Sequence, residues 1–216
     1  MSSSREAILG RIRTAIAGME QTLPVSRDYR ASGGLARSER IDLFCRRIGD
    51  YRAEVRRVAA GDLGPAIADA FERRSARRVG IAAGIPPAWR PAGVDLVEDG
   101  HLSSAELDRL DGVLTGCTLA IAETGTIVLA AGPSEGRRAL SLVPDLHVCV
   151  VGEDQVVELV PEAFSALADI VRRDRRPITF VSGPSATSDI ELSRVEGVHG
   201  PRTLVVLITD REPSRA

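Results

Sequence analysis

Three short apolar runs lie close together in the middle of the chain, at residues 119–122, 126–131 and 147–151. Glycine, proline or charged residues bound each run, a pattern typical of strands buried in a sheet rather than of helices. Polar turns separate the runs, at residues 123–125 and 132–138. A rigid apolar frame that carries polar turns is where a ligand site is expected.

The N-terminal part of the chain shows a helical period. After a serine-rich start, Ile8, Ile12 and Ile16 fall on one stripe and predict a first helix. Residues 21–34 show no period and predict a loop. The helical pattern resumes over residues 35–50 and predicts a second helix. The two helices are interpreted as an appendage that packs on the domain or on a partner.

From residue 51 onward, strand and helix patterns alternate. Besides the three central runs, strands are predicted at residues 54–58, 79–82, 94–97, 178–181 and 204–208, and helices at 62–74, 103–110 and 162–172. Alternation of this kind favours a parallel-rich sheet with helices on both faces. We therefore predict an N-terminal helical extension at residues 1–50 and one α/β domain at residues 51–216.

Composition narrows the function classes. The chain has 216 residues, of which 44% are hydrophobic and 27% charged, with a net charge of −2. These values are ordinary for a globular protein and give no reason to expect nucleic acid or a membrane as partner. No apolar run approaches the roughly 20 residues that cross a bilayer, and charges interrupt the apolar pattern of the N-terminus. We therefore expect a cytoplasmic protein.

Two features exclude common chemistries from this chain. All 28 basic residues are arginine, so a Walker lysine and a Schiff-base lysine are excluded. Cys45, Cys117 and Cys149 are far apart and form no CxxC pair, which argues against a disulfide scaffold, a zinc site or an iron–sulfur site. Cys117 and Cys149 adjoin apolar runs and are predicted to be small core residues. We also find no GxGxxG, GxSxG or HExxH motif.

The two central turns carry candidate site residues. Glu123, followed by Thr124 and Gly125, is either a solvated turn residue or a carboxylate placed for nucleophilic or acid–base work. Arg137 and Arg138 either bind a carboxylate or phosphate in bidentate fashion or form a solvated pair.

A third polar segment follows the predicted strand at residues 178–181. It carries Ser182, Gly183, Ser185, Thr187 and Asp189. Its hydroxyl and N–H groups can surround an anion, as in other backbone nests. The alternative is a loop that only caps the N–H groups of a following helix.

A fourth polar turn holds His199 between glycine and proline residues. Its imidazole suits proton transfer or pairing with an anionic ligand, although a lone histidine is more often structural. Asp145 and His147 share one face of a predicted strand, and with Asp189 and His199 they can be imagined as a metal site. Their spacing is not diagnostic, so no metal site is predicted.

Four segments, in this order along the chain, resemble the motifs of a known protein family: AETGTIVL, GRRALSLVPDLHVCVV, SGPSATSDIE and VEGVHGPRTL. This series, spanning about residues 115–208, resembles the motifs of LUD-domain proteins, in particular the lactate-utilisation protein C branch. The resemblance implies a fold of the NagB/RpiA/CoA-transferase-like type, a three-layer α/β/α sandwich. It also implies a role in the oxidation of L-lactate to pyruvate with partner proteins that carry iron–sulfur clusters, and no cofactor in this chain.

Whether the chain is itself an enzyme stays open. In fold relatives that transfer CoA, a glutamate on a comparable turn is the nucleophile, which suggests Glu123 by analogy only. The first hypothesis is a component of a lactate-oxidising system whose polar turns share one rim and bind a small anion. The alternatives are a non-catalytic subunit that docks the iron–sulfur partner, and a free-standing transferase or cyclo-ligase. The chain has no lysine to hold a nucleotide, which argues against the cyclo-ligase hypothesis.

Overall fold

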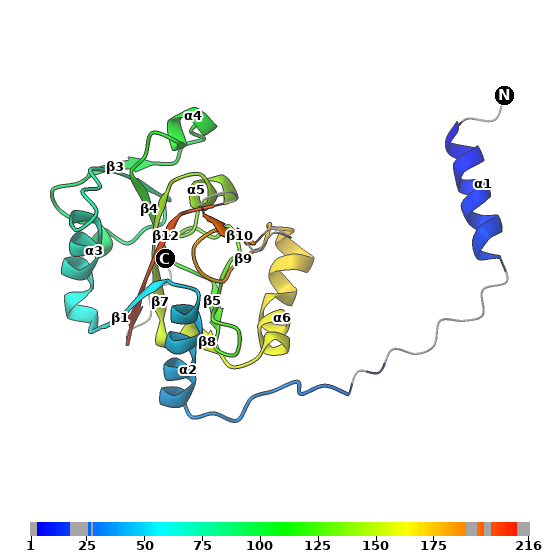
Figure 1. Ribbon diagram of the computed structural model, residues 1–216, viewed down its shortest axis with the longest axis horizontal. Helices are drawn as coiled ribbons and strands as arrows, with labels where there is room; N and C mark the ends of the chain where they lie inside the picture. The colour runs from blue at the N-terminus through cyan, green and yellow to red at the C-terminus, as the bar shows by residue number, and fades with distance from the viewer. Residues whose placement is uncertain (1–3, 18–25, 27, 189–193, 197–199, 211–216) are drawn as a thin grey trace. The chain divides into compact units, whose positions relative to one another are not determined.

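The computed structural model describes residues 4–17, 26, 28–188, 194–196 and 200–210. The chain divides into two compact units, Met1–Arg30 and Ala31–Ala216. The smaller unit contains helix α1 (Ser4–Ile16), none of whose residues is buried. The larger unit contains the remaining helices and all of the described strands (Figure 1).

A six-stranded parallel sheet forms the centre of the larger unit, as the alternating pattern predicted. In spatial order its strands are β1 (Glu54–Val58), β12 (Thr203–Thr209), β7 (Leu146–Gly152), β4 (Gly112–Thr115), β2 (Arg78–Ile81) and β3 (Asp95–Glu98). Strands β7 and β4 are buried along their whole length. For β7 this explains why residues 147–151 form a continuous apolar run rather than an alternating one.

A second, mixed sheet holds the other two central runs. Its strands, in spatial order, are β8 (Val156–Val157), β5 (Leu119–Ile121), β6 (Thr126–Leu129) and β9 (Thr179–Val181). Strands β5 and β6 form an antiparallel hairpin around the turn at residues 123–125. A separate antiparallel pair consists of β10 (Ala186–Ser188) and β11 (Arg194–Glu196).

The second sheet changes the order of the layers. One face of the six-stranded sheet packs against α3 (Leu63–Glu72) and α5 (Arg138–Leu142), whereas the other packs against the mixed sheet and α2 (Arg37–Asp50). Helix α6 (Val160–Asp169) covers the outer face of the mixed sheet. Figure 1 shows α3 and α6 on opposite sides of the strands. The α/β class is confirmed, but a sheet rather than helices alone covers one face of the main sheet.

Shorter elements complete the larger unit. They are η1 (Ala60–Asp62), η2 (Pro87–Trp89), α4 (Ser104–Leu107), η3 (Glu153–Gln155) and the π-helical turn η4 (Ile170–Asp174). Helix α4 begins with a reciprocal cap. The Glu106 carboxylate accepts the Ser103 N–H at 2.7 Å, and the Ser103 hydroxyl accepts the Glu106 N–H at 3.3 Å. This arrangement satisfies two N–H groups at the start of the helix.

Helix α2 belongs to the core of the larger unit. Its residues Ile41, Phe44 and Ile48 are fully buried against the second sheet and the adjoining face of the main sheet. Because this stripe contributes to the core, the compact unit starts at residue 31. The predicted extension at residues 1–50 therefore contains one helix outside this unit and one helix inside it.

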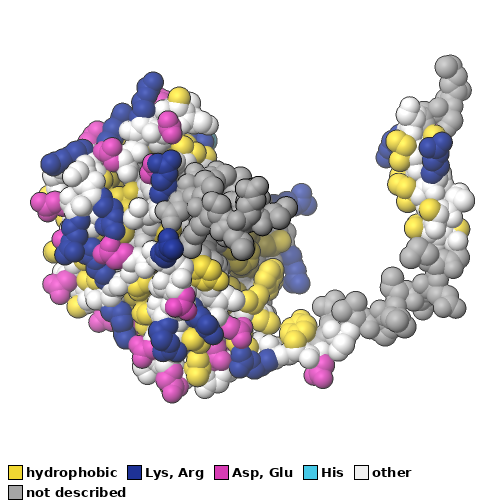
Figure 2. Space-filling model, in the orientation of Figure 1, with side chains coloured by type: hydrophobic (Ala, Val, Ile, Leu, Met, Phe, Trp, Pro, Cys, Tyr) yellow, Lys and Arg dark blue, Asp and Glu magenta, His cyan; other side chains and the backbone are white. Residues whose placement is uncertain are grey.

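Two properties of the molecule concern possible partners: the distribution of charge on its surface, and the length and apolar character of its helices. Arginine and acidic side chains alternate over the visible face of the larger unit, without a large region of one sign (Figure 2). Within the part of the chain that the structure describes, no helix combines the length and the apolar character that crossing a bilayer requires.

Candidate functional site

The turn between β5 and β6 packs against the C-terminal end of α2. Gly125 in this turn has a φ of +60°, a conformation that glycine adopts readily. A Cβ at this position would lie 2.5 Å from the backbone of Arg47 and Ile48. The sequence Glu-Thr-Gly therefore fits this turn because the helix leaves no room for a side chain at the third position.

A chain of hydroxyl groups connects this turn to the end of β9. The Oγ1 atoms of Thr124 and Thr126 are 2.7 Å apart, and Thr126 Oγ1 is 2.7 Å from Ser182 Oγ. The next residue, Gly183, has a φ of +96°, and a Cβ there would collide with Tyr51. The structure thus brings Thr124, Ser182 and Gly183 together with the glycine of the turn beside the end of α2.

Glu123 and Ser185 flank this hydroxyl chain in the sequence. The Glu123 side chain is exposed, and its backbone N–H donates to the Glu158 carbonyl at 3.0 Å. The Ser185 N–H donates to the carbonyl of Pro201 at 2.8 Å. Pro201 lies just before β12 and Tyr51 just before β1, so this group of residues lies at the amino-terminal edge of the parallel sheet.

Arg137 is held by a carboxylate of the protein itself. Its Nε and Nη2 atoms lie 2.7 Å and 3.0 Å from the two carboxylate oxygens of Asp99, and Nη2 also donates to the Leu102 carbonyl. Burial favours a higher pKa for Asp99, but hydrogen bonds from Arg137 and from the Leu102 N–H outweigh it and lower that pKa. The predicted bidentate recognition of a carboxylate therefore occurs within the chain. The neighbouring Arg138, the first residue of α5, is exposed.

Glu135 fixes the loop that carries the two arginines. Its side chain is only 3% exposed. One carboxylate oxygen accepts the N–H groups of Ala130 and Gly132 at 2.6 Å and 2.9 Å, and the other accepts the Thr118 hydroxyl at 2.6 Å. Sequence reasoning missed this role because Glu135 stands in a stretch of polar residues that reads as an exposed turn.

The same loop packs on the carboxyl-terminal edge of the main sheet. Gly84 follows β2 and Gly116 follows β4, and their N–H groups donate to the carbonyls of Pro133 and Ser134, both at 3.0 Å. A Cβ on either glycine would lie within 2.8 Å of the loop. Open α/β sheets usually bind ligands at such strand ends. Here the chain's own loop occupies the position.

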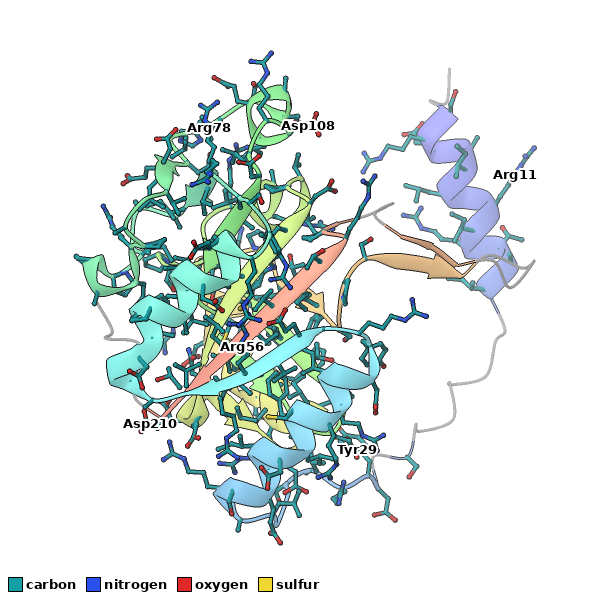
Figure 3. All side chains as sticks on the ribbon, turned by 60° about the vertical axis from the view of Figure 1, so that its left-hand side comes forward. Arg11, Tyr29, Arg56, Arg78, Asp108 and Asp210 are labelled. Carbon is teal, nitrogen blue, oxygen red and sulfur yellow. The ribbon has the colours of Figure 1, made fainter. Side chains whose placement is uncertain are left out.

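The predicted site residues lie at two opposite edges of the sheet. Asp99, which pairs with Arg137, follows the carboxyl end of β3, whereas Ser185 contacts the segment before the amino end of β12. Asp210, labelled in Figure 3, marks the carboxyl end of β12. Because all six strands are parallel, these ends cannot adjoin. The hypothesis that all polar turns share one rim is therefore wrong.

Three predicted residues cannot be placed among these groups. Thr187 belongs to β10, but its side chain is not described, and Asp189 and His199 lie outside the described residues. Their predicted roles in binding or proton transfer stay predictions.

A buried polar cluster between the two sheets was not predicted. Thr115 Oγ1 and His147 Nε2 are 2.8 Å apart, and Cys149 lies opposite Thr115 in the β4–β7 ladder. The core positions predicted for Cys117 and Cys149 are confirmed. The sequence did not predict the cluster because it did not predict β4, and without that strand nothing placed Thr115 beside His147. No group of three His, Cys, Asp or Glu side chains among the described residues is arranged to hold a metal ion.

The sequence and structure match known proteins. The family model for the LUD domain matches residues 95–209 of the chain. A lactate utilization protein C from Deinococcus radiodurans is 52% identical over 203 residues, which cover 93% of each chain. The chain belongs to the LUD-domain family. Another lactate utilization protein C, from Bacillus pumilus, is 39% identical over 95 residues, which cover 43% of this LUD-domain protein and 39% of that relative.

A solved structure is similar over most of the chain. The crystal structure of a DUF162 family protein from Deinococcus radiodurans superposes with a TM-score of 0.71. It is 47% identical in sequence, and the match covers 82% of this LUD-domain protein and 99% of that chain.

Proposed function

We propose that this LUD-domain protein is a cytoplasmic component of an L-lactate utilisation system, in which lactate is oxidised to pyruvate with partner proteins that carry iron–sulfur clusters. The observation that supports this proposal is the 52% identity to a lactate utilization protein C over nearly the full length of both chains. A role as one component fits the sequence, which lacks the cysteine spacing of a cluster site.

The finer fold assignment is also a proposal. The parallel sheet with helices on one face supports membership of the NagB/RpiA/CoA-transferase-like class. The mixed sheet makes the fold differ from a simple three-layer sandwich. Its strands β5 and β6 lie between β4 and β7 in the sequence.

In this proposal the small-anion site lies at the amino-terminal edge. Thr124, Ser182, Gly183 and Ser185 supply hydroxyl and N–H groups there, with Glu123 beside them. Arg137 is not part of it, because Asp99 already neutralises its guanidinium. Titration of the isolated chain with lactate, pyruvate and a nucleotide by calorimetry tests the site. Heat of binding that disappears in Ser182→Ala supports it, and no heat with any of the three rejects it.

The second candidate function is a non-catalytic subunit that docks the iron–sulfur partner. The observation that favours it is Arg138, which is exposed beside the internally paired Arg137 at the carboxyl-terminal edge. This function predicts that Arg138→Ala weakens co-purification with the partner while Arg202→Ala, at the opposite edge and paired with Asp145, does not. Equal recovery of partner with both variants contradicts it.

One experiment tests the lactate role directly. A strain that lacks this gene is complemented with the wild-type chain and grown on L-lactate as sole carbon source. We expect growth on lactate to be lost without the chain and restored with it, while growth on pyruvate is unaffected. Growth on lactate without the chain rejects the proposal. Turnover by the purified chain alone would instead support the free-standing transferase, with Glu123 as candidate nucleophile.

A further inference from the structure

Two of the three cysteines adjoin each other between the sheets. Cys149 lies in β7 opposite Thr115 of β4, and Cys117 lies two residues beyond Thr115 along the chain. Both side chains belong to one buried cluster, and each thiol is close enough to affect the protonation of the other. Their side chains are 4% and 0% exposed, whereas the third cysteine, Cys45, lies on α2 and is partly exposed.

Each thiol contacts a polar group, although both cysteines belong to the apolar cluster between the sheets. Cys149 Sγ lies 3.5 Å from the Gly116 carbonyl, and Cys117 Sγ lies 3.5 Å from the side-chain oxygen of Gln155. His147 precedes Cys149 by two residues and therefore lies on the same face of β7. Its Nε2 contacts Thr115, whereas its buried Nδ1 has no hydrogen-bond partner among the described residues. A buried polar nitrogen without a partner is costly and calls for an explanation.

We propose that Cys117 and Cys149 are a redox pair that a small hydroperoxide converts into a disulfide. In the first step the Cys149 thiolate attacks one peroxide oxygen, the O–O bond breaks, and the alcohol or water leaves with a proton, so that Cys149 becomes a sulfenic acid. In the second step the Cys117 sulfur attacks the Cys149 sulfur and releases water. Overall, two thiols and one hydroperoxide give one disulfide, one alcohol (water for hydrogen peroxide) and one water.

The protonation of the two thiols assigns their roles. The neighbouring Cys149 thiol, and then burial, raise the pKa of Cys117 well above its usual range. The neighbouring Cys117 thiol is the largest cause that lowers the pKa of Cys149, with burial opposing it and the nearby His147 adding to the lowering. The thiolate is the nucleophilic form of cysteine. Cys149 is therefore the sulfur that attacks the peroxide, and Cys117 is the one that closes the disulfide.

Burial selects the oxidant. Hydrogen peroxide is close to water in size, so a far smaller opening of the fold admits it to a buried thiol than a larger oxidant needs. A bulky disulfide such as oxidised glutathione requires an exposed sulfur, because the attack passes through a mixed disulfide. The proposal therefore concerns hydroperoxides and not thiol–disulfide exchange with small molecules. It is independent of the role in lactate utilisation.

Peptide mapping of the full-length chain tests the pair. The reduced protein is treated with hydrogen peroxide, its remaining thiols are alkylated, and the digest is analysed without reduction. We expect a peptide that links Cys117 to Cys149 as the main product, with Cys45 still alkylated. The initial rate should rise with pH around a midpoint below the usual cysteine value of 9.0, following the Cys149 thiolate. Oxidised glutathione should give no mixed disulfide at either sulfur.

Three variants complete the test. Cys117→Ser should leave a sulfenic acid on Cys149 that dimedone traps, Cys149→Ser should leave Cys117 reduced, and Cys45→Ser should form the disulfide at the wild-type yield. The proposal is overturned if wild-type protein yields no linked peptide, if Cys45 is oxidised first, or if the midpoint lies near 9. If Cys117→Ser or Cys149→Ser fails to fold, the peptide map of the wild-type protein and the pH dependence of its oxidation rate still test the proposal.

Discussion

Buried and half-buried carboxylates in this chain accept hydrogen bonds from backbone N–H groups. Glu135 accepts two N–H groups and a hydroxyl, which together fix the loop after β6. Glu158 accepts the Leu35 N–H at 2.7 Å, and Glu162 accepts the Gly33 N–H at 3.1 Å. These two bonds fasten the segment before α2 to the start of α6. Hydrogen bonds to charged acceptors are the stronger ones, so each such residue makes a measurable contribution to stability.

Replacement of Glu135 by glutamine should destabilise the protein by about 2–3 kcal/mol. Glutamine exchanges one acceptor oxygen for an NH₂ group, which then faces either two backbone N–H groups or a hydroxyl in a buried site. Urea unfolding followed by circular dichroism measures the change. Glu98→Gln, on an exposed side chain, is the matched control and should change stability by less than about 0.5 kcal/mol. Equal effects of the two substitutions would contradict the role given to Glu135.

The pair of Asp99 and Arg137 should make stability depend on pH. Because the pKa of Asp99 is lowered in the folded state, its contribution is complete above the pKa of the unfolded chain and disappears as the pH falls through the folded value. We expect Asp99→Asn to cost about 1–2 kcal/mol at neutral pH, allowing for the partly exposed arginine. Urea titrations should show this difference constant above about pH 5 and shrinking below about pH 4. A difference that is independent of pH would refute the ion pair as its source.

At the scale of elements, the local sequence pattern was sufficient to predict a strand and its bounds where the apolar residues are consecutive. Strand β1 was predicted at its observed bounds, and β7 and β12 within about one residue at each end. Strand β4 and helix α5 were missed. β4 has four residues next to glycines, and the five residues of α5 follow two arginines that read as part of a turn. Both elements are specified by tertiary packing, which no local period reports.

The hairpin turn of the second sheet depends on Gly125. Gly125→Ala should destabilise the protein by about 2–3 kcal/mol, because the new Cβ meets the backbone of α2 and the φ of +60° is unfavourable for alanine. Gly100→Ala is the control, since nothing lies within 4 Å of its Cβ position. Thermal unfolding of the two variants measures the difference. Similar melting temperatures would show that α2 yields to the side chain.

At the scale of the whole molecule, the sequence predicted the class of the fold but not the position of its site. The hypothesis of one rim failed because the contacts that place the turns are long-range. Arg137 pairs with Asp99, 38 residues away, and Ser185 bonds to the segment before β12. No residue close to Arg137 or Ser185 in the sequence indicates which distant residue it contacts. The boundary at residue 50 likewise missed that the apolar stripe of α2 fills the core between the sheets.

Two truncations test the boundary. Removal of residues 1–30 should leave the melting temperature of the rest unchanged within about 2 °C, since residues 31–216 have their own core and α1 buries no residue of its own. Removal of residues 1–50 also deletes Ile41, Phe44 and Ile48 and should abolish cooperative unfolding. Differential scanning calorimetry distinguishes the two. A cooperative transition in the shorter chain would restore the boundary at residue 50.

The loop that lies on Gly84 and Gly116 has a practical consequence for mutagenesis. A molecule arriving at that end of the strands would meet peptide groups, whose carbonyls at Pro133 and Ser134 already accept one hydrogen bond each. Each carbonyl oxygen has a second lone pair to offer. Alanine scanning removes side chains and leaves these acceptors untouched, so recognition at this edge would escape such a scan. Substituting the two glycines, which displaces the peptide groups themselves, would reveal it.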